Sequence, residues 1–154
     1  MTTDTVKSIG ADYTFFLAGL CYTSRARVNE PSSQAPQGEW AYQWERYEDD
    51  VSWLFKDWIA PNTLEGFAGK TVLDAGCGPG HHTRLVARHA ARVVALDLNT
   101  AEIAKERLAG LNNVETAEGD IAAWDSGERF DIVYSVGVVH HTAAPDKTVA
   151  HLVS

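Results

Sequence analysis

The chain has 154 residues, the length of one ordinary domain, and 45% of them are apolar, which is enough for a packed core. With 13 Lys and Arg against 21 Asp and Glu, the formal net charge at pH 7 is −8. This charge disfavours a nucleic-acid backbone or an anionic membrane surface as the main partner. The two cysteines, Cys21 and Cys77, give no disulfide framework and favour a reducing, cytoplasmic location.

Residues 1–39 are predicted to be an N-terminal extension and linker. Residues 15–22 form the longest apolar run of this part, far shorter than the roughly 20 residues that cross a bilayer. Asp4 and Asp12 precede it where a signal peptide has a basic region. We interpret the run as a small core segment or as a flap that covers a cofactor. Residues 23–39 have a composition typical of linkers, with Pro31, Ser32, Ser33, Pro36 and Gly38.

A lead-in segment over residues 40–69 is predicted to contain an amphipathic, aromatic helix at residues 40–60. Its apolar residues recur at steps of three and four from Trp44 to Trp58, as they do on one face of a helix. This face either packs against a sheet or closes over a cofactor at its N-terminal end, around Gln43 and Trp44.

Residues 70–154 alternate between strand patterns and helix patterns. Strands are expected at residues 71–73, 92–97, 114–117 and 130–136, and helices at residues 81–91, 99–110 and from 144 onward. This alternation predicts an α/β domain with a parallel, doubly wound sheet and right-handed crossovers.

The stretch of residues 71–80 reads TVLDAGCGPG, which is typical of a buried strand, a tight turn and a helix start. Its glycines let the backbone bend and let a ligand touch the main chain, and the helix start directs unpaired N–H groups at the turn. The spacing is G-x-G-x-G, not the G-x-G-x-x-G of dinucleotide binders. Asp74 at the strand end would repel a pyrophosphate but suit a cation. The turn is therefore predicted to hold a cationic, nucleotide-like cofactor.

Residues 72–80 resemble the first motif of the class I S-adenosylmethionine-dependent methyltransferases, of the type 11-like kind, which reads V-L-D-x-G-C-G-x-G. Residues 39–47 are similar to a leader segment of some small-molecule methyltransferases. The resemblance implies S-adenosylmethionine as cofactor and a three-layer, Rossmann-like sheet of seven strands in the order 3-2-1-4-5-7-6. Only strands 1–4 are visible, so the resemblance covers the N-terminal portion of the family. We expect a fragment of a longer enzyme, whose exposed, apolar fourth strand favours self-association.

The resemblance also assigns site residues at the carboxyl ends of the strands, where open parallel sheets bind ligands. Asp97 would accept hydrogen bonds from both ribose hydroxyls, and Leu98 would cover the adenine. Asp120 and Ile121 would contact the adenine amine and ring. The implied cofactor-binding residues are Asp74, Gly76, Cys77, Gly78, Gly80, Asp97, Leu98, Asp120, Ile121, Ser135, Gln43 and Trp44.

His140 and His141 follow the fourth strand, where the resemblance implies that methyl donor and acceptor meet. Histidine is a suitable general base near neutral pH, and His141 is favoured over His140 as the catalytic residue. The alternative is a structural pair at a strand end. His81, His82 and His89 lack the i, i+4 spacing of helical zinc pairs, so no metal site is predicted.

Three functions stay open at this point. The favoured one is an S-adenosylmethionine-dependent methyltransferase with a small-molecule acceptor and neither a nucleic-acid nor a membrane partner. No Asp/Asn-Pro-Pro-Tyr-like motif of nucleic-acid methyltransferases follows the fourth strand. A non-catalytic S-adenosylmethionine-binding module is the first alternative, because strands 5–7 normally complete the acceptor pocket. A dinucleotide-dependent oxidoreductase shares Asp97 but needs a different glycine spacing.

Overall fold

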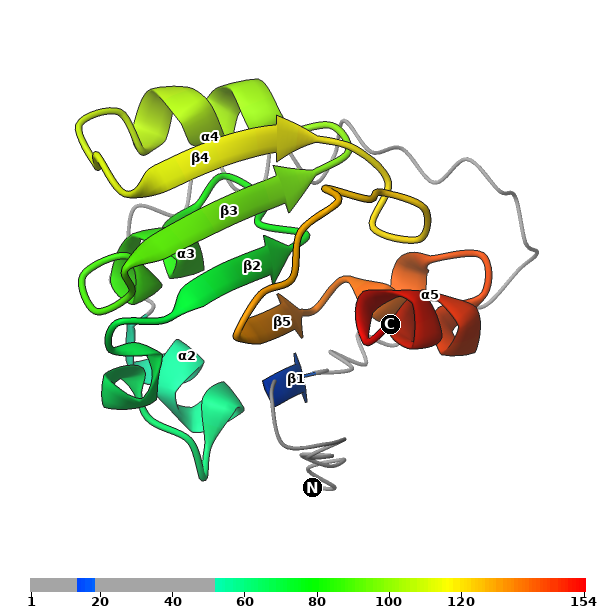
Figure 1. Cartoon of the computed structure of the whole chain (residues 1–154), viewed down its shortest axis with the longest axis horizontal. Coiled ribbons are helices and arrows are strands. Elements are labelled where there is room, and N and C mark those ends of the chain that lie inside the picture. Colours follow the sequence, from blue (N-terminus) through cyan, green and yellow to red (C-terminus); the bar gives the residue numbers. More distant parts are fainter. Residues whose placement is uncertain (1–13, 19–51) are drawn as a thin grey trace, which may run out of the picture.

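The computed structural model describes residues 14–18 and 52–154. Within these ranges, five parallel strands form one sheet in the order β1-β5-β2-β3-β4 (Figure 1). The strands are β1 (Thr14–Ala18), β2 (Thr71–Ala75), β3 (Arg92–Asp97), β4 (Val114–Glu118) and β5 (Ile132–Val136). The helices are α2 (Ser52–Ile59), α3 (His81–Val86), α4 (Ala101–Arg107) and α5 (Pro145–Leu152), with 3₁₀ turns η1 (Leu64–Phe67) and η2 (Val139–His141). The α/β class predicted from the alternation is confirmed.

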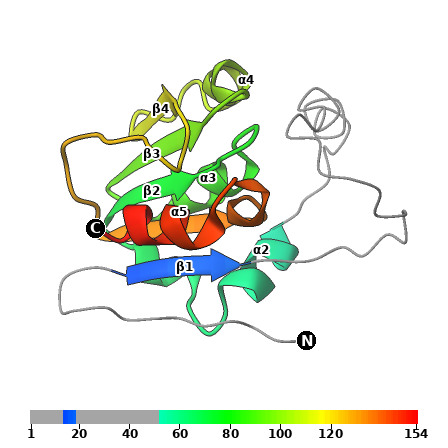
Figure 2. The ribbon, with the colours of Figure 1, turned by 90° about the vertical axis from the view of Figure 1, so that its right-hand side faces the viewer.

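The sheet is covered on both faces, which gives the three layers of a doubly wound fold (Figure 2). Successive side chains of a strand point to opposite faces. Val72 therefore joins a core with Phe55 and Phe67 under α2, α3 and η1, while Leu73 joins a second core with Val149 of α5. Both neighbours in the strand are buried, which explains why β2, β3 and β5 read as largely apolar runs.

The N-terminal apolar run supplies a strand of the sheet. β1 pairs with β5 in parallel over five residues, from Thr14 opposite Ile132 to Ala18 opposite Val136. Of the two interpretations of this run, the flap is wrong for residues 14–18, because they are hydrogen-bonded into the sheet. The prediction of an exposed fourth strand is also wrong, since β5 lies between β1 and β2. The reason for expecting self-association through β5 is thereby removed.

The other predicted elements differ from the structure mainly in their ends. The first helix after the glycine turn stops at Val86, and residues 87–89 are a turn instead of further helix. Helix α2 is the last part of the helix predicted at residues 40–60, and residues 40–51 lie outside the described part of the chain. None of the helices in the described ranges is long and apolar enough to cross a membrane.

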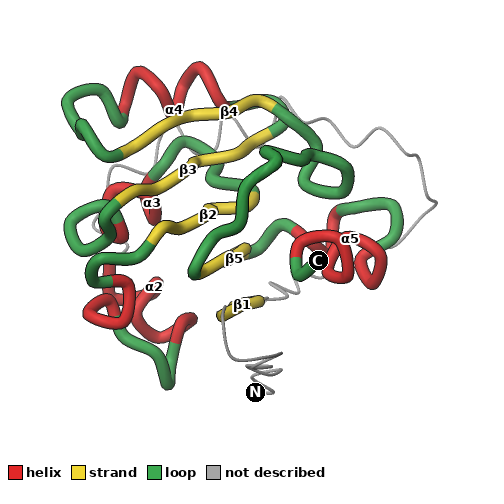
Figure 3. Tube along the Cα trace, viewed as in Figure 1, coloured by secondary structure: helices red, strands yellow, loops and turns green. Residues whose placement is uncertain are grey.

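All the strands point the same way, so their carboxyl ends share one edge of the sheet. The loops that follow β2, β3, β4 and β5 gather at this edge (Figure 3). They comprise residues 76–80, 98–100, 137–138 and the first part of the segment 119–131, whose last residues return to the amino ends of the strands, where Asp131 accepts a hydrogen bond from the Thr71 N–H. These loops hold most of the residues that the sequence marks as candidates for a site.

Candidate cofactor-binding site

The order of the strands reverses between β2 and β5. From β2 the chain continues to β3 and β4 on one side, and then returns to β5 on the other side of β2. In open parallel sheets, ligands bind beyond the carboxyl ends of the strands at such a reversal. The carboxyl ends of β2 and β5, a position that we call the crevice, are therefore the candidate ligand site of this fold.

The glycine turn after β2 forms the floor of this crevice. Gly76, Gly78 and Gly80 all have positive φ angles, of 90°, 54° and 88°. A Cβ atom on Gly76 would come within 2.6 Å of the Val138 side chain, and one on Gly80 within 2.8 Å of Leu108. A Cβ atom on Gly78 would meet nothing within 4 Å. Gly78 thus leaves an open surface at its backbone, where a ligand can approach the main chain.

The carboxylate of Asp97 organises the turn and the next helix together. Its Oδ2 accepts a 3.0 Å hydrogen bond from the backbone N–H of Gly78. Its Oδ1 accepts bonds of 3.0 Å each from the N–H groups of Asn99 and Thr100. Thr100 directly precedes α4, but its side chain makes no capping bond, and its N–H instead donates to Asp97. Next to Asp97, the Leu98 side chain is 44% exposed.

The loop after β4 lies against the end of β3. The Gly119 N–H donates to the carbonyl of Asp97 over 3.1 Å. Asp120 forms a tight turn in which its Oδ1 accepts a 2.9 Å bond from the Ala122 N–H. Ile121 is buried, whereas Asp120 is exposed. The fold therefore brings Asp97, Asp120 and the glycine turn to one edge, as the sequence predicts.

Asp74 lies beneath the turn instead of on its surface. The side chain is 2% exposed, and its Oδ2 accepts two hydrogen bonds of 2.6 Å, from the hydroxyls of Thr83 and Tyr134. Burial raises the pKa of Asp74 to about 6, although the two hydroxyl donors favour the charged form. Burial and the charge of Asp74 raise the pKa of Tyr134 well above its usual value. Asp74 thus ties β2 to α3 and β5.

Two further side chains of the predicted set also point inward. The thiol of Cys77 donates to the Gly78 carbonyl over 3.3 Å, and burial raises its pKa. The hydroxyl of Ser135 donates to the Ala75 carbonyl over 2.7 Å and is fully buried. Both side chains are therefore engaged within the protein. The predicted residues Gln43 and Trp44 lie outside the described part of the chain.

His140 and His141 lie side by side in η2, directly beyond β5. Their ring centroids are 3.9 Å apart with a tilt of 43°, and both residues are exposed. Partial burial and the neighbouring His140 lower the pKa of His141. A lowered pKa keeps the imidazole neutral at pH 7, which is the form that accepts a proton.

Sequence reasoning missed Thr83 and Tyr134 as partners of Asp74. Tyr134 gave one usable signal, because it places a hydroxyl in a mostly apolar, buried strand, and buried hydroxyls need a partner. Thr83 gave none beyond its place in the first turn of a helix. Among the described residues, no three His, Cys, Asp or Glu side chains gather as a metal site would require.

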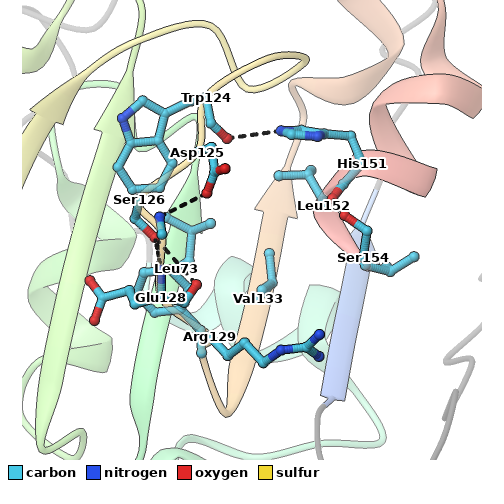
Figure 4. Close-up of a pocket in the computed structure, with 13 residues that line it drawn as sticks. Leu73, Trp124, Asp125, Ser126, Glu128, Arg129, Val133, His151, Leu152 and Ser154 are labelled. Carbon is cyan, nitrogen blue, oxygen red and sulfur yellow. Dashed lines mark hydrogen bonds between the residues drawn. The ribbon is translucent and has the colours of Figure 1, made fainter.

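A cavity of about 500 Å³ lies away from the crevice, on the α5 face of the sheet (Figure 4). Leu73 and Val133, from the middle of β2 and the first half of β5, line it together with the loop of residues 124–130 and the C-terminal residues 151–154. Its position on a face of the sheet, not at the strand ends, separates it from the glycine turn.

The family model that matches this chain and the curated relatives that resemble it agree on one protein family. The family model described as "Methyltransferase domain" matches residues 72–153, more than half of the chain. The chain is 38% identical over 93 residues to a ubiquinone biosynthesis O-methyltransferase of Chelativorans sp. (strain BNC1). It is 31% identical over 105 residues to a tRNA U34 carboxymethyltransferase of Cronobacter sakazakii, and 31% over 111 residues to a trans-aconitate 2-methyltransferase of Azoarcus sp. (strain BH72).

These matches cover 56%, 64% and 68% of the chain but only 36%, 31% and 43% of the three relatives. The chain thus spans less than half the length of the curated relatives it matches. Among solved structures, the YcgJ protein of Bacillus subtilis is similar with a TM-score of 0.54 at 23% identity, over 58% of this chain and 42% of that one. Phosphoethanolamine N-methyltransferase 1 of Haemonchus contortus gives a TM-score of 0.51 at 21% identity, over 80% and 29%. These likenesses show the fold.

Proposed function

Because the chain belongs to the class I S-adenosylmethionine-dependent methyltransferases, we propose that it transfers the methyl group of S-adenosylmethionine to a small-molecule acceptor. One observation carries the proposal. The acid that ends β3, Asp97, is bonded to the N–H of Gly78, the glycine whose Cα faces open space. The proposed ribose acceptor and a backbone position open to a ligand thus lie together at the reversal of the strand order.

The residues at the crevice fit this cofactor. In the proposed site, Gly78 takes the backbone approach of the ligand, Asp97 accepts from the ribose hydroxyls, and the exposed Leu98 covers the adenine. Asp120 would accept from the adenine amine beside Ile121. No Lys or Arg stands in residues 98–100, so nothing there would favour a 2′-phosphate. That composition supports an unphosphorylated adenosine over a phosphorylated dinucleotide.

The chemistry that S-adenosylmethionine supplies when bound is a methyl group activated by a positively charged sulfur. The work left to the chain is to orient the reactants and exclude water, and orientation contributes on the order of 7–11 kcal/mol in well-aligned reactions. Asp74 places a buried negative charge beneath the turn, which favours a cation there. His141 would accept a proton from an acceptor that must lose one, since its lowered pKa keeps it neutral at pH 7.

A small-molecule acceptor is supported by two facts about this chain. Its net charge of −8 opposes a polyanionic acceptor. The names of two of the relatives, ubiquinone biosynthesis O-methyltransferase and trans-aconitate 2-methyltransferase, indicate small acceptors. The relative named as a tRNA U34 carboxymethyltransferase is the counterexample that the experiment must address.

The test is a transfer assay with S-adenosylmethionine labelled at the methyl group. The 154-residue chain is incubated with a panel of phenols, small carboxylic acids and total tRNA, and the label in each fraction is counted. The proposal expects label in a small molecule and none in tRNA. Label in tRNA alone would overturn the acceptor class, and calorimetry without any heat of S-adenosylmethionine binding would overturn the function.

A further inference from the structure

Helix α5 is attached at both of its ends to loops of the crevice. At its start, the buried hydroxyl of Thr148 donates to the Thr142 hydroxyl over 3.1 Å, and Thr142 donates to the carbonyl of Val139 in η2 over 2.7 Å. At its end, Nε2 of His151 lies 2.8 Å from the carbonyl oxygen of Trp124 (Figure 4). A carbonyl only accepts, so Nε2 carries the proton in this contact. The helix therefore connects the loop after β5 with the loop after β4.

Trp124 in turn is held against the residues proposed to contact adenine. A Cβ atom on Gly119 would lie 2.5 Å from Cδ1 of Trp124, so the indole rests directly on the Gly119 backbone. The Trp124 N–H donates to the Asp120 carbonyl over 2.7 Å, which closes the tight turn that contains Ile121. Trp124 and Ile121 also belong to one apolar cluster with Leu152 of α5. Any shift of Trp124 is thereby passed to Asp120 and Ile121.

We propose that His151 is a positioning residue for the adenine end of the cofactor, acting through its hydrogen bond to the Trp124 carbonyl. This inference rests on the proposed function, because it takes residues 119–121 as the adenine contact. The bond fixes the backbone at Trp124, the indole fixes Gly119, and the Asp120 carboxylate is then held where it can discriminate an exocyclic amine from a carbonyl. His151 itself touches no ligand.

The test uses two substitutions that differ in the N–H donor. His151→Leu removes the donor, whereas His151→Gln keeps an amide N–H at the same number of bonds from the backbone. Calorimetry gives the affinity of each protein for S-adenosylhomocysteine and for S-inosylhomocysteine, in which a carbonyl replaces the adenine amine. His151→Leu is expected to lower the preference for adenine by about two- to tenfold, the range for one net hydrogen bond, and His151→Gln is expected to restore it.

Amide hydrogen exchange in the ligand-free protein provides a second readout. The N–H groups of Ala122 and Trp124 are expected to exchange faster in His151→Leu than in the wild type. His89→Leu is the control, because it removes an imidazole on the opposite face of the sheet, and the exchange rates of these two groups should not change in it. Unchanged preference and exchange in His151→Leu, or a Gln variant no better than Leu, would overturn the inference. A wild-type chain that binds no S-adenosylhomocysteine would contradict the proposed function, while the exchange experiment would still decide whether His151 holds the loop.

Discussion

The carboxylate of Asp97 accepts a 3.0 Å hydrogen bond from the N–H of Gly78, although the two residues lie 19 positions apart in the sequence. The same carboxylate also accepts from the N–H groups of Asn99 and Thr100, the two residues that directly precede α4. One acidic group thus sets the glycine turn, the start of a helix and the proposed ribose contact. A ligand that bonds to Asp97 necessarily lies against Gly78.

The substitution Asp97→Ala is expected to weaken S-adenosylmethionine binding by about 1.5–3 kcal/mol, the range for hydrogen bonds to a charged group. Calorimetry on the folded variant measures this loss directly. Asp125→Ala is the control, because among the described residues that exposed acid bonds within its own loop, to the Gly127 N–H. Equal affinities of the Asp97 variant and the wild type would rule out Asp97 as the ribose contact.

The substitution Gly78→Ala separates ligand binding from backbone strain. An alanine at φ 54° costs about 1–2 kcal/mol of stability wherever it occurs. Gly69 is the matched control, because it has φ 71°, no atom within 4 Å of an added Cβ, and a position outside the crevice. Both alanine variants should lose similar stability in urea unfolding, but only Gly78→Ala should lose affinity for S-adenosylmethionine. Equal affinities in the two variants would show that no ligand approaches Gly78.

The strands around the glycine turn could be predicted because they depend on local pattern. The apolar run of β3 fixed both of its ends, and Pro145 fixed the start of α5. The place of β1 could not be predicted in this way. Its partner β5 lies more than 100 residues further along the chain, and a parallel pairing leaves no turn signal between the two strands.

Within the candidate site, the sequence predicted which residues meet at the edge but not which atoms are already bonded. Asp74 was expected to face the ligand because it ends a strand beside the glycines. Its side chain instead lies between Thr83 and Tyr134, at distances in sequence of 9 and 60 residues. Partners at such separations depend on how α3 and β5 pack on β2, which residue spacing does not encode.

The raised pKa of Asp74 predicts a specific pH dependence of stability. The carboxyl binds its proton more tightly in the folded chain, with a pKa of about 6 against 3.8 in the unfolded one. Its contribution to the free energy of unfolding is therefore greatest below pH 3.8 and decreases as the pH rises to about 6. Asp74→Asn cannot titrate, so its stability relative to wild type should increase over this interval. Urea unfolding between pH 4 and 7 measures the difference, and a constant difference would contradict the buried, shifted carboxyl.

Removal of the Tyr134 hydroxyl should raise the upper limit of this interval, because only the pKa of the folded state changes. That hydroxyl donates to Asp74 and favours its charged form, so Tyr134→Phe leaves the carboxylate less stabilised. The comparison of Tyr134→Phe with the double variant Tyr134→Phe, Asp74→Asn over the same pH range measures the shift. An interval that stays in place would show that the hydroxyl does not act on Asp74.

His141 is expected to contribute more to methyl transfer than His140 when the acceptor must lose a proton. His141→Ala should lower kcat by about 10²- to 10⁴-fold, the usual contribution of a general base, with a smaller effect of His140→Ala. Because the pKa of His141 is lowered, the rate should decline only at a pH below the ordinary histidine value. His89→Ala, on the other face of the sheet, is the control. Equal rates and pH profiles for His141→Ala and wild type would leave the histidine pair with a structural role.

The most direct test of the central claim is a map of backbone amide shifts, measured by nuclear magnetic resonance, during titration with S-adenosylmethionine. The proposed site predicts the largest shifts at the amides of Gly78, Leu98 and Ile121, and small shifts around the α5-face cavity at residues 125–130. A parallel titration with NAD should produce no comparable shifts at the glycine turn. An absence of shifts at Gly78, or shifts confined to residues 125–130, would contradict the assignment of this crevice as the cofactor site.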